Sequence, residues 1–237
     1  MDEREYLDWF ETIKEKRKPI LLDFYKSFFD SPENAENFID NVYNSVSIDF
    51  EIQENECFPI PRNKKLRMMN NIQRFSSVMD VIEGKEVIKL FFLITCIESL
   101  YEIANKKLKL YGTLVDLLDN HLEDTEKLEI TNGFHHSIAD DKYIMANRDF
   151  DINAVSKLLV ELRNVFAHEG IYWEFSFSNG DYPVQNNIYI IEVDEFSRKE
   201  NVKKERTYDI SITYEDLRKL LIKAMINFIN DEKNTAY

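Results

Sequence analysis

The residues of this chain best suited to chemistry lie close together, in the segment Arg163-Asn164-Val165-Phe166-Ala167-His168. An arginine guanidinium can hold a phosphate with two parallel hydrogen bonds. A histidine exchanges its proton near neutral pH and can act as a general acid or base. Together they form a minimal set for cleaving a phosphodiester bond, in which His168 moves protons and Arg163 offsets charge on the crowded phosphorus.

The segment 151–170 is predicted to form one amphipathic helix. Asp151 suits the N-cap and Gly170 the C-terminal cap, which places His168 in the last turn. Arg163 lies at the edge between an apolar arc and a polar stripe, and Val160 is an apolar residue on the outward half of the wheel. The arc holds Val155, Leu158, Leu159, Leu162, Val165 and Phe166, and the stripe holds Asn153, Lys157, Glu161, Asn164 and His168.

The pattern Arg-Asn-x-x-x-His at the end of such a helix resembles the signature of the HEPN superfamily, a group of small all-helical domains. The resemblance extends over 64–230, of which 151–170 is the specific part. It implies that Arg163 and His168 are a catalytic pair, with Asn164 in support. Glu98 resembles a second feature of the family, an acidic residue on the helix beside the motif helix. Gly170 departs from the toxin branch, which often carries a tyrosine there.

Many HEPN proteins are metal-independent endoribonucleases that act as toxins or in antiviral defence. The resemblance implies a homodimer in which two motif helices meet and form a composite cleft for RNA. The RNA's own 2′-hydroxyl would be the nucleophile, leaving a 2′,3′-cyclic phosphate. A non-catalytic HEPN-like module for binding or dimerisation, such as an antitoxin or a regulatory scaffold, is the alternative. A toxin whose acidic first 61 residues cover its basic stretch is a third hypothesis.

The net charge of −14 opposes nucleic-acid binding, because phosphate contacts require basic groups. The charge is uneven, however. Residues 1–61 carry 15 acidic and 6 basic side chains, whereas 62–111 carry 5 acidic and 10 basic ones. The basic side chains that begin this second segment are candidate RNA contacts, or else the solvated start of a helix. They are Arg62, Lys64, Lys65 and Arg67.

The chain holds only 5 Gly and 5 Pro, which predicts a mainly α fold: a helical bundle with a short β-hairpin or small sheet near the C-terminus. We expect 1–61 to be an acidic helical extension and 62–237 to be the HEPN-like domain, with a β insertion at about 171–213. Within that insertion, 172–177 and 188–193 are the expected strands and 199–206 a charged loop. Before it we expect a helix over 113–128 and a loop over 131–137.

The sequence predicts no metal and no cofactor. Cys57 and Cys96 lie too far apart for a metal-ligand pair, and no third ligand is in register with His135-His136. The longest apolar run, 90–97, is far shorter than a membrane span, and the acidic N-terminus does not resemble a signal peptide. We therefore expect a cytoplasmic protein whose partners are RNA, a second copy of the chain and an antitoxin or regulatory protein, with no membrane partner.

Overall fold

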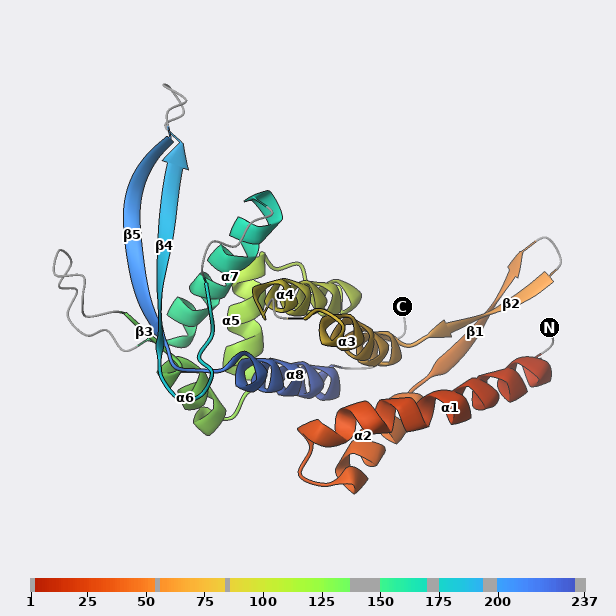
Figure 1. Cartoon of the computed structure of the whole chain (residues 1–237). Helices are drawn as coiled ribbons and strands as arrows, with labels where there is room; N and C mark the ends of the chain where they lie inside the picture. The colour runs from red at the N-terminus through yellow and green to blue at the C-terminus, as the bar shows by residue number, and fades with distance from the viewer. Residues whose placement is uncertain are drawn as a thin grey trace.

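The computed structural model describes residues 3–53, 56–83, 86–136, 150–169, 175–193 and 200–232. The molecule is mainly helical with a small sheet, as predicted (Figure 1). Its helices are α1 Glu3–Tyr25, η1 Lys26–Phe28 (a 3-10 turn), α2 Pro32–Asn44, α3 Lys64–Asp80, α4 Glu86–Ile103, α5 Leu110–Asn120, α6 Asp124–Asn132, α7 Ile152–Glu169 and α8 Tyr214–Asp231. Its strands are β1 Ser47–Gln53, β2 Glu56–Arg62, β3 Phe134–His136, β4 Val184–Val193 and β5 Glu200–Ile210.

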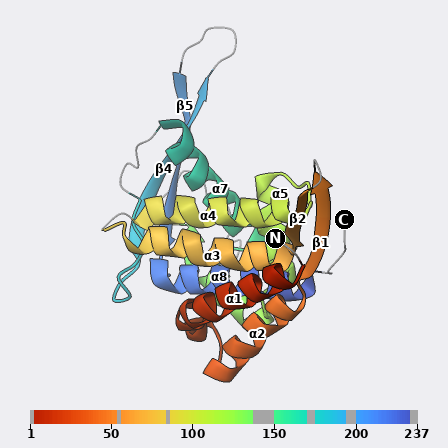
Figure 2. The same ribbon diagram turned by 90° about the vertical axis from the view of Figure 1, so that its right-hand side faces the viewer.

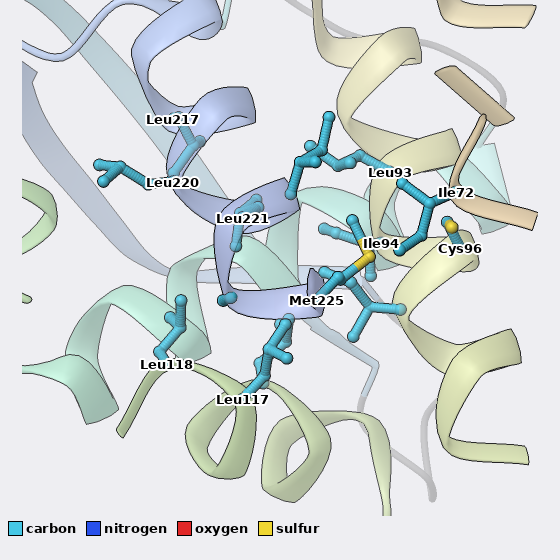
Figure 3. Packing of buried hydrophobic residues seen from close by; sticks show 14 of the residues in the cluster. Ile72, Leu93, Ile94, Cys96, Leu117, Leu118, Leu217, Leu220, Leu221 and Met225 are labelled. Atoms are coloured by element: carbon cyan, nitrogen blue, oxygen red, sulfur yellow. The ribbon is translucent and has the colours of Figure 1, made fainter. Parts of the chain in front are cut away.

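Helix α4 lies at the centre of the bundle, as its nearly continuous apolar surface requires. It packs against α3, α5, α7 and α8, and Figure 2 shows α4, α3 and α8 lying side by side. Their buried side chains interlock with those of α5, as Figure 3 shows for Leu93 and Ile94 of α4, Leu117 of α5 and Leu221 of α8. This core holds in place the two helices, α4 and α7, that carry the candidate site residues.

The helices of the acidic first 61 residues join the same hydrophobic cluster as the helices that follow them. The buried Tyr25 hydroxyl donates to the Met69 carbonyl of α3 at 2.7 Å. The Arg17 guanidinium reaches the side-chain oxygens of Asn70 and Gln73, also on α3, at 3.0 and 3.2 Å. Ser31 caps α2 as its sequence position predicts, accepting from the Asn34 backbone N–H. Helices α1 and α2 therefore pack against α3.

The small sheet has the strand order β3-β5-β4, all antiparallel. Strands β4 and β5 form a long hairpin that projects beyond the helices (Figure 1). The prediction of a loop over 199–206 was wrong, since 200–206 belong to β5 and pair with β4. Ladder hydrogen bonds come from the backbone, so a charged segment can form a strand without apolar alternation. The expected strand 172–177 is not seen at 175–177, and 172–174 lie outside the described residues.

Further strands lie outside the predicted insertion. The segment 134–136, expected to be a loop, is β3, and it pairs with β5 through Phe134↔Ile210. Gly133 precedes it because a Cβ there would lie 2.6 Å from that of Ile212. Residues 47–53 and 56–62 form the antiparallel pair β1–β2, in which Phe50 lies opposite Pro59. Proline is tolerated there because each strand of a two-stranded ladder has an unpaired edge.

Between α4 and α7 the chain forms two short helices rather than the single predicted helix over 113–128. Helix α5 ends at Asn120 and α6 begins at Asp124. The break is stabilised by the Glu126 carboxylate, which accepts a hydrogen bond from the Glu123 backbone N–H at 3.0 Å. None of the helices that the structure describes is long and apolar enough to cross a membrane.

Candidate functional site

Helix α7 lies against α4, α5 and α6 with the face that the sequence predicts. Val155, Leu158, Leu159 and Leu162 are buried, whereas Lys157 on the polar stripe is exposed. Asp151 caps the helix, its Oδ1 accepting from the Ala154 backbone N–H at 2.7 Å. The burial of the apolar arc fixes the rotation of α7 and so determines where Arg163 emerges. The side chains of Val165 and Phe166, in the last turns, lie outside the described part.

The Arg163 guanidinium makes three contacts that fix its position. Its Nη2 lies 2.9 Å from Oε2 of Glu98 on α4, and its Nη1 donates to Oδ1 of Asn164 at 3.3 Å. Its central carbon also lies 5.7 Å from the centre of the Phe91 ring, a cation–π distance. The structure therefore brings together Arg163, Asn164 and Glu98, which are three of the predicted site residues.

This group of side chains is only partly covered by protein. The Arg163 side chain is 25% exposed and that of Glu98 is 34% exposed. Of the five N–H groups of the guanidinium, one points to Glu98, one to Asn164, and that on Nε is buried with no hydrogen-bond partner among the described residues. Within the described part of the chain, one N–H on each terminal nitrogen thus has no acceptor, and a phosphate suits such a pair of donors.

Glu98 lines a cleft of about 450 Å³ where α4 passes into α5. Helix α4 ends there because Asn105 adopts a left-handed conformation, φ 60°. The Lys106 N–H then returns to the Tyr101 carbonyl at 2.9 Å, which closes the helix end. The chain continues as Lys106-Lys107-Leu108-Lys109, of which Lys106, Lys107 and Leu108 line the cleft. Sequence reasoning missed this segment, although three lysines in four positions were a signal for it.

His168 belongs to the last turn of α7, as predicted, but its side chain lies outside the described residues. The position of His168 relative to Arg163 is therefore known only from the helix backbone. Five positions of an α-helix correspond to about 140° of rotation and a rise of about 7.5 Å. The two residues occupy the same end of α7 on different sides, so a substrate that contacts both has to reach across that end.

The predicted basic RNA contacts at the start of α3 differ from one another in their surroundings. The Lys65 ammonium donates to the Asn230 carbonyl at 3.2 Å, at the C-terminal end of α8, where a cation stabilises the helix. Its partial burial lowers the pKa of Lys65. Arg67 is exposed and Lys64 half-buried, and the side chain of Arg62 lies outside the described residues. Nothing in these contacts joins the segment to α7.

One premise of the predicted dimer was wrong. The helical wheel places Val160 outward, but in the structure it is half-buried and packs against the core cluster. The wheel treats α7 as if it had a single buried side, whereas α4, α5 and α6 cover it from several directions. The homodimer now rests on the resemblance alone and stays a prediction.

His135 and His136 lie on β3, where His135 is exposed and the side chain of His136 is outside the described part. Among the described residues no group of three or more His, Cys, Asp or Glu side chains could hold a metal ion. Cys96 is buried in the core, and burial raises the pKa of its thiol well above the usual range.

Neither protein-family models, curated proteins nor solved structures include one that matches the chain.

Proposed function

We propose that this protein is a metal-independent endoribonuclease of the HEPN type, and that Arg163 and His168 are its catalytic pair. The observation that supports this best is the position of Arg163 and the contacts that hold it. It lies at the edge of α7, partly exposed, held by Glu98 and Asn164, and with N–H groups left on both terminal nitrogens. An arginine fixed in this way is prepared to receive a phosphate, because little side-chain freedom is lost when the phosphate binds.

The reaction follows from the roles of the side chains. A base, His168 in one of its two states, takes the proton of the RNA 2′-hydroxyl, and the 2′ oxygen attacks the adjacent phosphorus. The bond from phosphorus to the 5′ oxygen breaks, and that oxygen takes a proton from an acid. The products are a 2′,3′-cyclic phosphate and a free 5′-hydroxyl. Arg163 stabilises the extra negative charge on the phosphoryl oxygens in the transition state.

Each member of the Arg163 group has a separate part in the proposal. Glu98 is a positioning residue: it holds the guanidinium and offsets its charge in the absence of substrate. Asn164 holds the other terminal nitrogen. A second protomer would complete the cleft around His168, as the resemblance implies. A toxin or antiviral effector is the biological role that fits such an activity.

The test uses purified protein and several RNAs of defined sequence in excess EDTA. Cleavage should persist in EDTA, give 2′,3′-cyclic phosphate ends, and fail on DNA and on 2′-O-methyl RNA. His168→Ala should abolish cleavage while circular dichroism stays unchanged. The nuclease proposal is wrong if the wild type cleaves none of the RNAs and if cells that express the wild type or His168→Ala show the same growth and the same RNA integrity.

A non-catalytic binding module is the second candidate, and one observation favours it. The charge of Arg163 is already balanced by Glu98, and the whole chain carries a net charge of −14. A module of this kind would contact a protein partner through the same face and leave RNA intact. The two candidates are separated by the EDTA experiment, since only the nuclease yields cyclic phosphate ends.

A further inference from the structure

The cleft at the connection between α4 and α5 adjoins the Arg163 group through a shared side chain. Glu98 both lines the cleft and binds the Arg163 guanidinium. On the other side, the Tyr111 hydroxyl of α5 donates to Oδ1 of Asn153, on the polar stripe of α7, at 3.1 Å. Glu98 in the cleft and Tyr111, which follows the cleft on α5, thus contact α7 at Arg163 and Asn153. Those two residues are ten positions apart, about 15 Å along the helix axis.

Positive charge and exposed apolar surface occur together at the cleft, on Lys107 and Leu108, and just beyond it along the chain, on Lys109 and Tyr111. Lys107 and Lys109 are exposed and have no ion-pair partner among the described residues. Leu108 and Tyr111 are 50% and 43% exposed as whole residues. Alternating lysines and exposed apolar side chains are typical of surfaces that bind single-stranded nucleic acid, in which lysines meet phosphates and rings stack on bases.

The other charges at the cleft are nearly balanced. Lys106 is paired with Glu232 at 3.0 Å, and Glu98 is paired with Arg163. Glu102 is an exposed carboxylate in the same cleft, and it opposes phosphate binding. Lys107 in the cleft and Lys109 next to it in the sequence offset Glu102 and the Asp116 carboxylate, which accepts from the Tyr101 hydroxyl, so this place is close to neutral on an acidic molecule.

From these observations we propose that the α4–α5 cleft, together with the segment 107–111 that leads from it into α5, is a subsite for single-stranded RNA, binding nucleotides beside the bond that is cleaved at Arg163. Lys107 and Lys109 contact phosphates, and the Tyr111 ring and Leu108 take a base. Asn105 at the cleft wall offers a carboxamide to a base edge. The inference rests on the proposed function for the position of the scissile bond, but RNA binding here can be measured without cleavage.

The experiment measures binding of the full-length protein to a fluorescent 2′-O-methyl RNA oligonucleotide, which resists cleavage, over a range of salt concentrations. Lys107→Ala combined with Lys109→Ala should weaken binding and reduce the slope of log affinity against log salt by about 1.4, since each phosphate contact on a single strand contributes about 0.7. Glu102→Gln should strengthen binding. The matched control removes two exposed lysines elsewhere, Lys16→Ala with Lys219→Ala, and should change neither quantity.

The apolar part of the subsite has its own pair of variants. Tyr111→Ala should weaken binding about tenfold without changing the salt slope, because stacking releases no counterions. Tyr111→Phe keeps the ring and removes only the hydrogen bond to Asn153, so it should bind nearly as tightly as the wild type. An equal loss of RNA affinity in both variants would mean that the Tyr111 hydroxyl holds the local structure and that the ring does not stack on a base.

The outcomes separate this inference from the proposed function. If the protein binds RNA through Lys107, Lys109 and Tyr111 but cleaves none, the subsite proposal is supported and the nuclease proposal is wrong. If the protein cleaves RNA but none of these substitutions changes its RNA affinity or its cleavage pattern, the subsite proposal is wrong and the nuclease proposal stands. Failure of the wild type to bind any single-stranded RNA overturns the subsite.

Discussion

Two arginines of this molecule are held by carboxylates in nearly the same way, yet their surroundings give them different capacities. Arg163 on α7 binds Glu98, and Arg218 on α8 binds Asp80 at 2.8 Å and Glu215 at 3.4 Å. In both side chains Nε is buried with no hydrogen-bond partner among the described residues. Among the described residues Arg163 pairs with one carboxylate, which balances its charge, whereas Arg218 pairs with two, so that its group carries a net negative charge.

The cavity beside Arg218 is the larger one, about 660 Å³ against about 450 Å³ at Glu98. Asp23 and Asp216 also line it, so carboxylates dominate its walls. A phosphate would be repelled there, while at Arg163 it would meet a balanced pair with lysines nearby. Thus the number of carboxylates around an arginine, rather than the size of the cavity beside it, distinguishes a candidate phosphate site from a structural ion pair.

The largest effect should appear when each arginine is removed in turn. Arg163→Ala should lower the rate of RNA cleavage by about 10²- to 10³-fold, the usual effect of removing one donor to a charge that develops in a transition state. Arg218→Ala should leave the rate within about twofold of the wild type. Both rates are measured in EDTA on the same RNA. Equal losses for the two variants would show that the arginines are not functionally distinct.

Removing the carboxylate partners should give a smaller effect. Glu98→Ala should lower kcat about tenfold, because the freed guanidinium loses its orientation, and KM should fall or stay unchanged because a repelling charge is gone. Glu98→Gln retains an acceptor for Nη2 and should recover part of kcat, as a positioning residue requires. Glu215→Ala is the control beside Arg218. A rise in KM with normal kcat would assign Glu98 to substrate binding instead.

Stability should hardly distinguish the two ion pairs. Arg163→Ala and Arg218→Ala should each lower the free energy of unfolding by about 1 kcal/mol, because the carboxylates they leave behind are partly or largely exposed to water. The Arg218 side chain is the more buried, and its aliphatic stem adds some packing. Urea titrations followed by circular dichroism measure both. A loss of 3 kcal/mol or more at Arg163 would mean that the activity loss reports unfolding.

Local features of this molecule could be predicted from the sequence, and long-range ones could not. The caps Ser31, Asp151 and Thr213 act as their positions indicate, and the apolar arc of α7 is buried where it was described. Such features depend on residues within one or two helical turns of each other. The pairing of β3 with β5 joins segments more than 70 positions apart, and nothing in either segment specifies its partner.

The candidate site divides in the same way. The motif on α7 is contiguous, so its spacing could be read directly. Glu98 lies 65 positions from Arg163 and was suggested only by the resemblance to the HEPN pattern. The cleft lysines were missed because a basic run acquires meaning only when the fold shows which charges have partners. Lys65 donates to the end of α8, whereas Lys107 has no ion-pair partner among the described residues.

The smallest expected effect tests that last distinction. Lys65→Ala removes a cation from the C-terminal end of α8 and should lower the free energy of unfolding by about 0.5 kcal/mol. Its RNA affinity and salt slope should equal those of the wild type, because its ammonium is already bound to the Asn230 carbonyl. Lys107→Ala should do the reverse, weakening RNA binding without lowering stability. If Lys65→Ala weakens RNA binding as much as Lys107→Ala does, the start of α3 belongs to the RNA surface after all, as the charge distribution along the sequence first suggested.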